Sequence, residues 1–335
     1  MACHLAIAGV TGAVGQEFLS ILEQRDFPFD TLKVLASSRS AGKKISFKGK
    51  EYTVEELSKD SFAGIDIALF SAGGARSKEF APAAVEAGAV VVDNSSAFRM
   101  DPEVPLVIPE INAGAIKGHK GIIANPNCST IIGIVPVWPL HKANPVKRMI
   151  VSTYQAASGA GMSAMRELEA QSRDVLEGRE PTCEAFPYQI AFNCFNHNSA
   201  LAPSGYNEEE MKLVKETRKI FDCPEIAITA TCVRIPVMRA HCESINLEFT
   251  DPMSPDQVRE LLGTAPGVTV MDDRRNNRFP MPIDASGRDD VYVGRIRRDE
   301  SLPEDRGINL WVAGDQLRKG AALNAVQIAE KLLDL

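Results

Sequence analysis

The sequence lacks the features that mark membrane proteins, disulfide-rich secreted proteins and basic nucleic-acid-binding proteins. No apolar run in the 335 residues approaches the roughly 20 residues of a membrane-spanning helix. The net charge of −7 supplies no overall basic field for a nucleic acid. The seven cysteines are odd in number and include no Cys-x-x-Cys pair, so we expect neither a metal site nor a disulfide framework. We therefore expect no membrane and no nucleic acid among the partners.

What the sequence does contain is the ordinary balance of a globular protein, with 44% hydrophobic and 24% charged residues. Its length suits two domains better than a single core. The first residues, Met1–Ile7, lead directly into an apolar strand, so we expect no signal peptide. Together with the scattered cysteines, this predicts a cytoplasmic protein.

A glycine motif near the N-terminus points to a dinucleotide. The apolar strand Leu5–Gly9 runs into Gly9–Gly15, which reads G-x-x-G-x-x-G, and Gln16–Gln24 follows with helical spacing. Strand, glycine turn and helix in this order let the backbone approach a pyrophosphate at the helix N-terminus. This placement favours a dinucleotide site over a purely structural turn.

The end of the second predicted strand bears on which dinucleotide is bound. An NAD enzyme usually has an acidic residue here, but the strand Leu32–Ser38 is followed by Arg39 and Ser40. A guanidinium and serine hydroxyls can pair with a 2′-phosphate, so the sequence favours NADP. The alternative for Arg39 is an ordinary solvated loop arginine.

Strands and helices alternate up to about residue 125, which is typical of a parallel, doubly wound α/β sheet. Ligands bind such sheets at the carboxyl ends of the strands, where Arg99 lies as a candidate anion clamp or as a surface ion pair. The expected elements are the hairpin Lys44–Phe47 with Glu51–Val54, the strands Asp66–Gly74, Ala89–Asp93, Leu106–Glu110 and Gly121–Ala124, and the helix Lys78–Glu86.

Cys128 lies where this first region ends. Asn125-Pro126 forces an extended or turn geometry, and Ser129-Thr130 opens an apolar stretch that is expected to be a helix. A thiol at a helix N-terminus faces unpaired N–H groups and the positive end of the helix dipole, which favour a reactive thiolate. Free cysteines are also commonly buried structural residues, and the local pattern alone leaves both interpretations open.

The second half predicts a different sheet, mixed or antiparallel, because its later strands follow one another without long helices between them. A long ordered loop is expected over residues 178–207. The expected strands are Arg148–Tyr154, Ala227–Val237, His241–Phe249, Val268–Met271, Asp290–Arg297 and Ile308–Ala313. The expected helices are Ser163–Leu176, Asn207–Ile220 and Ser254–Leu262, with a last helix from Asp315 to Leu335.

Two further features of this half are candidates for the site. Arg234 and His241 flank the connection between two strands, and a histidine is the commonest base that activates a thiol, although His241 could also be a core or surface histidine. Glu209 and Lys212 lie three residues apart on one predicted helix, a pattern that by itself indicates a solvated ion pair.

Several motifs, taken together and in order, resemble those of the bacterial aspartate-semialdehyde dehydrogenases over nearly the whole chain. The matching stretches are Gly9–Gly15, Ser95–Arg99, Asn125–Thr130, Tyr154–Gly159, Glu209–Lys212, Arg234–His241 and Gln316–Ala322. The resemblance implies a Rossmann-type domain over residues 1–127, completed by the C-terminal helix 316–335. It also implies an α+β catalytic and dimerisation domain over 128–315, the architecture of glyceraldehyde-3-phosphate dehydrogenase, and a homodimer.

The resemblance also assigns roles to individual residues. Cys128 is implied to be the nucleophile, His241 the acid/base and Gln155 the residue that orients the substrate. Glu209 is implied to bind the substrate's amino-acid end with Arg234. The residues implied to hold the phosphate are Arg99, Asn127 and Lys212. Those implied to contact NADP are Gly9, Thr11, Gly12, Ala13, Val14, Arg39, Ser40, Ser158, Gly159 and Gln316.

The implied reaction is the NADPH-dependent reduction of aspartyl phosphate to aspartate semialdehyde and phosphate through a thioester on Cys128. It serves the biosynthesis of lysine (through diaminopimelate), threonine and methionine. N-acetyl-γ-glutamyl-phosphate reductase shares this chemistry, but Ser129-Thr130 after the cysteine argues against it. A catalytically silent binding paralogue is the other alternative, and the presence of both Cys128 and His241 argues against it.

Overall fold

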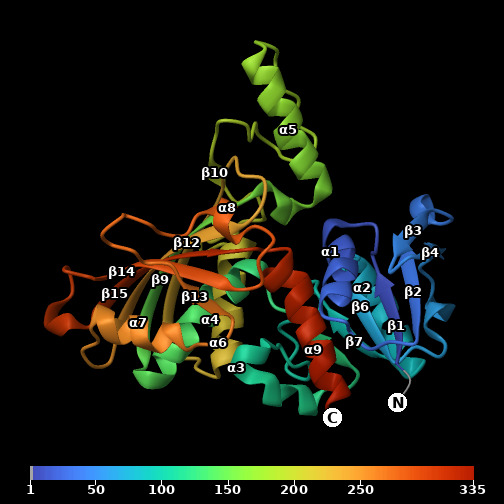
Figure 1. Ribbon diagram of the computed structural model, residues 1–335, viewed down its shortest axis with the longest axis horizontal. Coiled ribbons are helices and arrows are strands. Elements are labelled where there is room, and N and C mark those ends of the chain that lie inside the picture. Colours follow the sequence, from blue (N-terminus) through green and yellow to red (C-terminus); the bar gives the residue numbers. More distant parts are fainter. Residues whose placement is uncertain (1–2) are drawn as a thin grey trace. The chain divides into compact units, whose positions relative to one another are not determined.

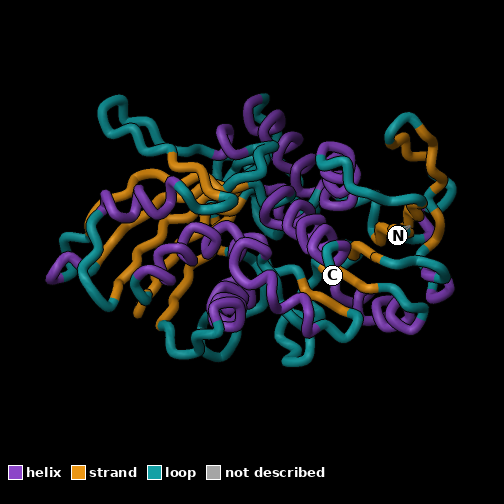
Figure 2. Tube along the Cα trace, turned by 60° about the horizontal axis from the view of Figure 1, so that its bottom comes forward, coloured by secondary structure: helices purple, strands orange, loops and turns teal. Residues whose placement is uncertain are grey.

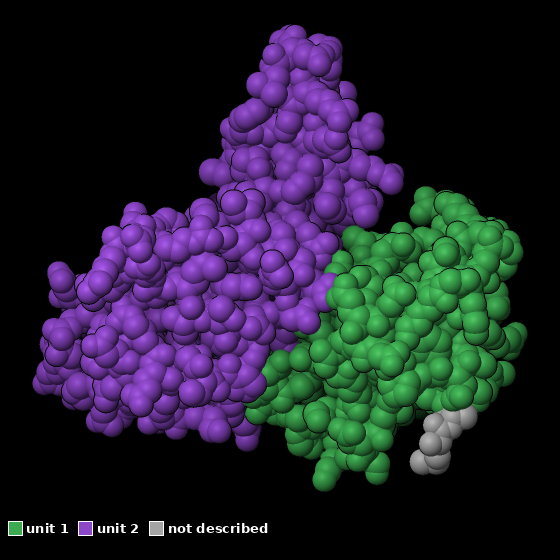
Figure 3. All heavy atoms as spheres, in the orientation of Figure 1, with its two compact units in different colours: residues 1–127, 321–335 green, residues 128–320 purple. Residues whose placement is uncertain are grey.

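The computed structural model describes residues 3–335 and divides the chain into two compact units (Figure 3). Unit 1 contains the residues up to Asn127 together with Ala321–Leu335. Unit 2 is the continuous segment Cys128–Gly320. The chain therefore leaves unit 1 once and returns to it for its last helix.

Unit 1 is built on a parallel six-stranded sheet with the order β5-β2-β1-β6-β7-β8. Its strands are β1 (His4–Ala8), β2 (Thr31–Ala36), β5 (Glu55–Glu56), β6 (Ile67–Phe70), β7 (Val90–Asp93) and β8 (Ile122–Ala124). The hairpin β3 (Lys44–Phe47) and β4 (Lys50–Thr53) lies outside this sheet. The predicted hairpin and the predicted doubly wound sheet are both confirmed.

Helices cover both faces of this sheet, which explains why its central strands are apolar on both sides. The helices are α1 (Ala13–Gln24), α2 (Gly74–Glu86), α3 (Pro109–Asn112) and α9 (Leu323–Leu333). On one face Phe18 of α1 and Val326 of α9 pack with Ile7 of β1. On the other face Ala81 of α2 packs in a separate cluster with Phe70 of β6.

Two predictions in unit 1 need correction. The segment Leu106–Glu110 is not a strand: Leu106 forms only an isolated bridge to Ala124, and Pro109 begins α3. Proline has no N–H for a sheet and favours the first turn of a helix, which explains the difference. Helix α2 also begins four residues before the predicted Lys78, at Gly74, the second residue of a glycine pair.

Unit 2 contains a mixed seven-stranded sheet with the order β10-β11-β9-β12-β15-β14-β13. Its strands are β9 (Val146–Gln155), β10 (Phe195–Asn196), β11 (Ala227–Arg234), β12 (His241–Phe249), β13 (Val268–Val270), β14 (Val291–Arg298) and β15 (Gly307–Gly314). Strand β12 is antiparallel to both neighbours, whereas β9 pairs with β11 in parallel. The predicted mixed sheet is confirmed, and Figure 1 labels β9, β10 and β12 to β15 in it.

The helices α4 (Cys128–Ala143), α6 (Glu208–Phe221) and α7 (Pro255–Gly263) pack on this sheet. Figure 2 shows the chain coloured by helix, strand and loop. Strand β12 alternates accordingly, with Ile245 and Leu247 buried and Ser244 and Asn246 half-buried. The other helices are α5 (Met162–Leu176) and α8 (Pro282–Ala285). Short helical turns are η1 (Ser38–Ser40), η2 (Lys59–Phe62), η3 (Ala113–Gly118), η4 (Ala157–Ala160) and η5 (Pro303–Asp305).

The last element is not the single helix from Asp315 that the sequence predicts. The Asp315 carboxylate accepts N–H groups from Leu317 and Arg318, and a π-helical turn, η6 (Arg318–Ala322), comes before α9. Single π turns inside helices are frequent at functional sites. Within residues 3–335, no helix combines the length and apolarity needed to cross a membrane.

Candidate active site

Cys128 and His241 lie together in unit 2. Cys128 is the first residue of α4 and His241 is the first residue of β12, and 3.7 Å separates the cysteine Sγ from the imidazole Nε2. Cys128 is half-buried, whereas His241 is fully buried. One small molecule can therefore touch both side chains.

The hydrogen bond at the far side of the ring sets the protonation of His241. The backbone N–H of Ala156 donates to Nδ1 at 3.0 Å, so Nδ1 carries no proton and Nε2 carries the ring hydrogen. Burial, and then the positive charge of Arg234, lower the pKa of His241 to about 3. His241 therefore presents a neutral Nε2–H donor to the sulfur.

A strained turn leads into His241. Ala240 has φ of +71°, which a residue other than glycine rarely adopts, and its N–H donates to Gln316 Oε1 at 2.9 Å. Gln316 Nε2 donates to the hydroxyl of Ser158. The two ends of the Gln316 amide thus join the turn before His241 to the glycine-rich loop after β9.

Two glycines fit closely against the reactive pair. A Cβ at Gly159 would lie 3.0 Å from the His241 ring and 2.8 Å from the Arg234 guanidinium. A Cβ at Gly320, in the π-helical turn, would lie 3.0 Å from the Cβ of Cys128. Side chains at either position would push against the site, so the absence of a Cβ is part of its geometry.

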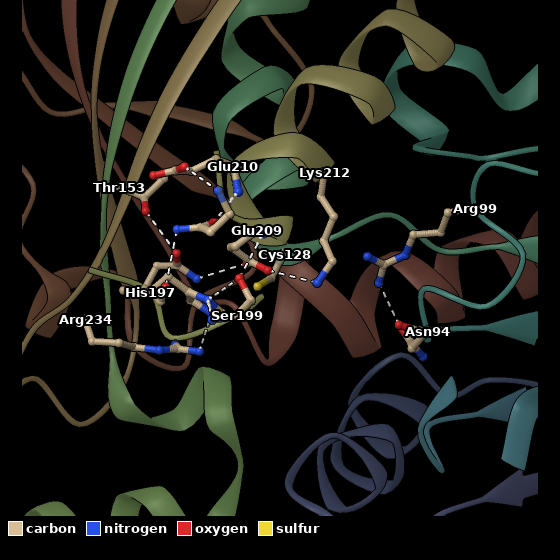
Figure 4. Close-up of polar contacts among 12 residues, drawn as sticks. Asn94, Arg99, Cys128, Thr153, His197, Ser199, Glu209, Glu210, Lys212 and Arg234 are labelled. Carbon is tan, nitrogen blue, oxygen red and sulfur yellow. Dashed lines mark hydrogen bonds and ion pairs between the residues drawn. The ribbon is translucent and has the colours of Figure 1, made fainter. Parts of the chain in front are cut away.

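A chain of buried polar groups runs from β9 to α6. Gln155 accepts the Thr153 hydroxyl at 3.0 Å and donates to Glu209 Oε1 at 3.2 Å. Lys212 lies 3.0 Å from the other carboxylate oxygen of Glu209 (Figure 4). The solvated-pair interpretation is wrong for Glu209, which is 4% exposed. The Asn207 capping box fixes the first turn of α6 and so directs Glu209 toward Gln155.

Arg234 ends β11 and is buried. Its Nη2 donates to His197 Nε2 at 2.8 Å, its Nη1 donates to the Ala156 carbonyl at 3.3 Å, and its guanidinium lies 5.9 Å from the Phe186 ring centroid. The sequence analysis did not single out His197. It lies in the irregular segment 178–207, where no periodicity or motif could have indicated it.

In unit 1, Arg99 is a buried residue and not a surface ion pair. Its Nε donates to the Asn125 carbonyl at 2.9 Å and its Nη2 donates to the Asn94 carbonyl at 2.7 Å. Asn127, the last residue before Cys128, is also buried. The backbone oxygen atoms of Asn94 and Asn125 therefore help to fix the direction of the Arg99 guanidinium.

The glycine turn between β1 and α1 fits a bound dinucleotide. A Cβ at Gly9 would lie 2.3 Å from the Ser71 carbonyl oxygen, and one at Gly15 would lie 2.2 Å from the Gly9 carbonyl oxygen, so both allow close backbone packing. Gly12 is the N-cap of α1 and Thr11 is exposed, so the helix N-terminus carries no capping side chain there. Such a terminus can receive a pyrophosphate.

Arg39 and Ser40 lie in η1, directly after β2, and Arg39 is exposed. The Gly9 N–H donates to the Leu35 carbonyl at 2.8 Å, which brings the glycine turn beside the end of β2. The two predicted parts of the cofactor site are thus neighbours within unit 1. Residues 3–335 contain no group of three or more His, Cys, Asp or Glu that could hold a metal ion.

Two family models match the chain. Residues 4–119 match the semialdehyde dehydrogenase NAD-binding domain, and residues 137–319 match the semialdehyde dehydrogenase dimerisation domain. Aspartate-semialdehyde dehydrogenase of Synechocystis sp. is 56% identical over 99% of this chain and 97% of its own. That of Bacillus subtilis is 50% identical over 99% of this chain and 98% of its own.

Solved structures agree with this relationship. The structure of Vibrio cholerae aspartate semialdehyde dehydrogenase II complexed with ASA has a TM-score of 0.97 and 45% identity, over 100% of this chain and 99% of that one. The Candida albicans enzyme with NADP has a TM-score of 0.77 and 27% identity, over 99% and 98%. The expected fold, a Rossmann-type sheet plus a mixed-sheet domain, is confirmed, and the chain belongs to the aspartate-semialdehyde dehydrogenase family.

Proposed function

We propose that this protein reduces L-aspartyl 4-phosphate to L-aspartate 4-semialdehyde with NADPH, releasing phosphate, through a thioester on Cys128. The observation that carries the proposal is the 3.7 Å contact between Cys128 Sγ and His241 Nε2 at the start of α4. Membership in the family supplies the substrate class, and the buried polar groups around this pair suit a charged amino acid.

The covalent step uses Cys128 as a thiolate. Its sulfur attacks the acyl carbon of the phosphate anhydride, the carbonyl oxygen becomes an oxyanion, and the C–O bond to phosphate breaks to leave a thioester. The N-terminal N–H groups of α4 lie beside the sulfur and can stabilise the oxyanion. The bound nicotinamide supplies a hydride to the thioester carbon.

His241 acts as a hydrogen-bond donor in this scheme. The neutral Nε2–H can donate to the thiolate before attack and to the sulfur again when the hemithioacetal oxyanion collapses to aldehyde and thiolate. Because Ala156 holds Nδ1, the ring keeps the orientation and tautomer that this role requires.

Glu209 and Arg234 form the part of the site that suits the amino-acid end of the substrate. An ammonium group pairs with a carboxylate, and a carboxylate pairs with a guanidinium. Both side chains are buried and therefore weakly screened, and the Arg234 Nε has no hydrogen-bond partner among the described residues. Gln155 orients the Glu209 carboxylate by donating to its Oε1.

We assign phosphate binding to Arg99, Asn127 and Lys212. The support is chemical: Arg99 and Lys212 are cationic, and Arg99 is buried against backbone carbonyl groups that fix its direction. For the cofactor we propose NADP, held by the turn Thr11–Val14 and by Arg39 and Ser40. We also assign contacts with NADP to Ser158, Gly159 and Gln316. The Candida albicans relative was solved with NADP.

We also propose a homodimer, supported by the match of residues 137–319 to a dimerisation domain. The half-buried face of β12, with Ser244 and Asn246, is the kind of sheet surface that a second subunit can cover. Light scattering of the purified protein gives its mass directly, and a monomer at micromolar concentration would contradict this part of the proposal.

One assay tests the reaction. Purified protein, L-aspartate semialdehyde, phosphate and NADP are mixed, and NADPH is followed at its absorbance maximum. Omitting either phosphate or the semialdehyde should abolish NADPH formation. Faster turnover with N-acetylglutamate semialdehyde would identify the related reductase instead, and no turnover with either aldehyde would identify a silent binding protein.

A further inference from the structure

The segment His197–Ser199 contacts both Arg234 and Glu209, the two residues that we assign to the substrate's amino-acid end. Arg234 Nη2 donates to His197 Nε2 at 2.8 Å, and His197 Nδ1 lies 3.1 Å from the Ser199 hydroxyl oxygen. The backbone N–H of Glu209 donates to that same oxygen at 3.2 Å. Figure 4 shows His197 and Ser199 linking Arg234 to the first turn of α6.

We propose that His197, assisted by Ser199, is a positioning residue that fixes the Arg234 guanidinium and the Glu209 backbone for recognition of the substrate's α-carboxylate and ammonium groups. This inference rests on the proposed function and deepens it. It assigns a role to the irregular segment before α6, which no sequence motif covers.

The direction of each hydrogen bond follows from the chemistry of arginine. A guanidinium has donors only, so His197 Nε2 must accept and the ring hydrogen must be on Nδ1, from which it donates to Ser199 Oγ. The Ser199 N–H also lies 3.3 Å from Nδ1, but this longer contact would need Nδ1 to accept. The contact with a donor-only group at 2.8 Å decides the tautomer. Burial, opposed by the Glu209 charge but aided by that of Arg234, lowers the pKa of His197 to about 4, so the ring is neutral.

The segment is itself held in place before any substrate arrives. The N–H of His197 donates to the Cys232 carbonyl at 2.8 Å, and Asn207 Nδ2 donates to the His197 carbonyl at 3.3 Å. Strand β10 pairs Phe195 with Arg234 in antiparallel register. Because Arg234 is long and flexible, a rigid acceptor on its Nη2 removes rotamers that would turn the guanidinium away from a carboxylate.

The experiment compares His197→Leu, which removes the acceptor, with His197→Gln, whose amide oxygen can still accept from Arg234. We expect His197→Leu to raise the KM for aspartate semialdehyde about tenfold to a hundredfold and kcat to change far less, because a ground-state contact is lost. His197→Gln should recover most of that affinity. The KM values for phosphate and NADP should change by less than about twofold in both variants.

A truncated substrate distinguishes the loss of Arg234 positioning from a nonspecific disruption of the active site. In 3-aminopropanal the α-carboxylate of aspartate semialdehyde is missing, so Arg234 has nothing to bind. Its ammonium group remains for Glu209, so His197→Leu should lower kcat/KM with this aldehyde far less than with aspartate semialdehyde. His141→Gln is the matched control, because His141 is also a partly buried histidine that accepts a backbone N–H, from Val146.

The outcomes separate this inference from the proposed function. If wild type turns over aspartate semialdehyde but His197→Leu raises all three KM values alike, or loses activity equally with 3-aminopropanal, the positioning role is wrong while the function stands. If wild type itself shows no phosphate-dependent turnover, both are wrong. Should His197→Leu fail to fold, Ser199→Ala takes its place, and an unchanged KM for aspartate semialdehyde in Ser199→Ala would overturn the role.

Discussion

The reactivity that we propose for Cys128 rests on its place at the first position of α4. Cys232 and Cys242 lie within strands, and burial raises the pKa of both thiols, that of Cys242 to about 12, so neither forms a thiolate near neutral pH. Cys128 instead combines partial exposure, a helix N-terminus and the Nε2–H of His241 at 3.7 Å. Identical side chains thus differ in chemistry because of backbone position and solvent access.

Replacing Cys128 by serine tests this assignment. A serine hydroxyl is far less acidic and nucleophilic than a thiol, so Cys128→Ser should lower kcat by roughly a thousandfold or more while folding and NADP binding persist. Steady-state kinetics, with circular dichroism and NADP titration on the same samples, measure the three quantities. Cys194→Ser, at an exposed cysteine, is the control. Wild-type turnover in Cys128→Ser would remove this residue from the mechanism.

We propose that Arg39 determines which form of the cofactor is preferred. A charge-assisted hydrogen bond is worth about 1.5–3 kcal/mol, so losing one to the 2′-phosphate should weaken NADP binding about tenfold to a hundredfold. NAD lacks this phosphate, and its affinity for Arg39→Ala should hardly change. Fluorescence titration of both dinucleotides against both proteins measures the ratio, and equal losses would show that Arg39 does not read the phosphate. Arg76→Ala, at an exposed arginine of α2, is the control.

At the scale of single residues, the sequence indicates those residues whose chemistry depends on their neighbours along the chain. Cys128 follows Asn125-Pro126 and precedes a helix, and that local pattern is enough to suggest a nucleophile. The burial of Glu209 and the role proposed for His197 depend on contacts across β10, β11 and α6, which no local spacing encodes. Only the family resemblance corrected the interpretation of Glu209, and it did not indicate His197.

At the scale of elements, α4 and β12 meet at a buried carboxyl group. Glu243 lies two residues after His241 on the buried face of β12, and a Cβ at Gly133 of α4 would lie 2.5 Å from its Oε2. Neither carboxyl oxygen has a hydrogen-bond partner among the described residues. Burial, and then the charge of Glu209, raise the pKa of Glu243 well above its ordinary value. The folded protein therefore keeps this group protonated as the pH rises past the value at which the unfolded chain loses the proton.

Glu243→Gln should show how this buried ionisable group changes the stability of the protein with pH. Because the pKa of Glu243 is raised on folding, its contribution to stability is complete below the ordinary glutamate pKa and is lost as the pH rises toward the folded value. A neutral glutamine does not titrate. The melting temperature of the variant minus that of wild type should therefore rise by a few degrees between pH 5 and pH 8, at about 2–4 °C per kcal/mol. Glu248→Gln, half-buried on the same strand, controls for strand effects. A difference between Glu243→Gln and wild type that is constant with pH would mean that Glu243 is charged in the folded state.

The elements themselves are largely predictable because their signals are periodic. Strands β1, β2, β6 and β7 and helices α1, α5, α6 and α7 lie close to their predicted positions. The secondary-structure predictions that are wrong lie where a strong local rule opposes a weaker sequence pattern. An apolar run suggests a strand at Leu106–Glu110, but Pro109 begins a helix, and the carboxylate of Asp315 holds a turn that delays α9 to Leu323.

At the scale of the whole molecule, unit 1 is completed by residues far along the chain. Asn324 of α9 donates to the Val107 carbonyl at 2.9 Å and to the Asn125 side chain at 2.6 Å. Val326, Ile328 and Ala329 are fully buried in the same core as β1 and α1. An amphipathic pattern predicts the helix but not the core that it joins, because the pattern shows which face is apolar and not what covers it.

Ile328→Ala measures how much this last helix contributes to unit 1. Removing a fully buried isoleucine side chain leaves a cavity and should lower the free energy of unfolding by about 2–5 kcal/mol, whereas Leu333→Ala, at a residue 42% exposed, should cost about 0.5 kcal/mol or less. Urea unfolding gives both values. Hydrogen exchange should then quicken in β1 and α1, some 300 residues away in the sequence, and not in β15, which α9 follows more closely along the chain. Faster exchange confined to β15 and β12 would show that α9 stabilises unit 2 instead.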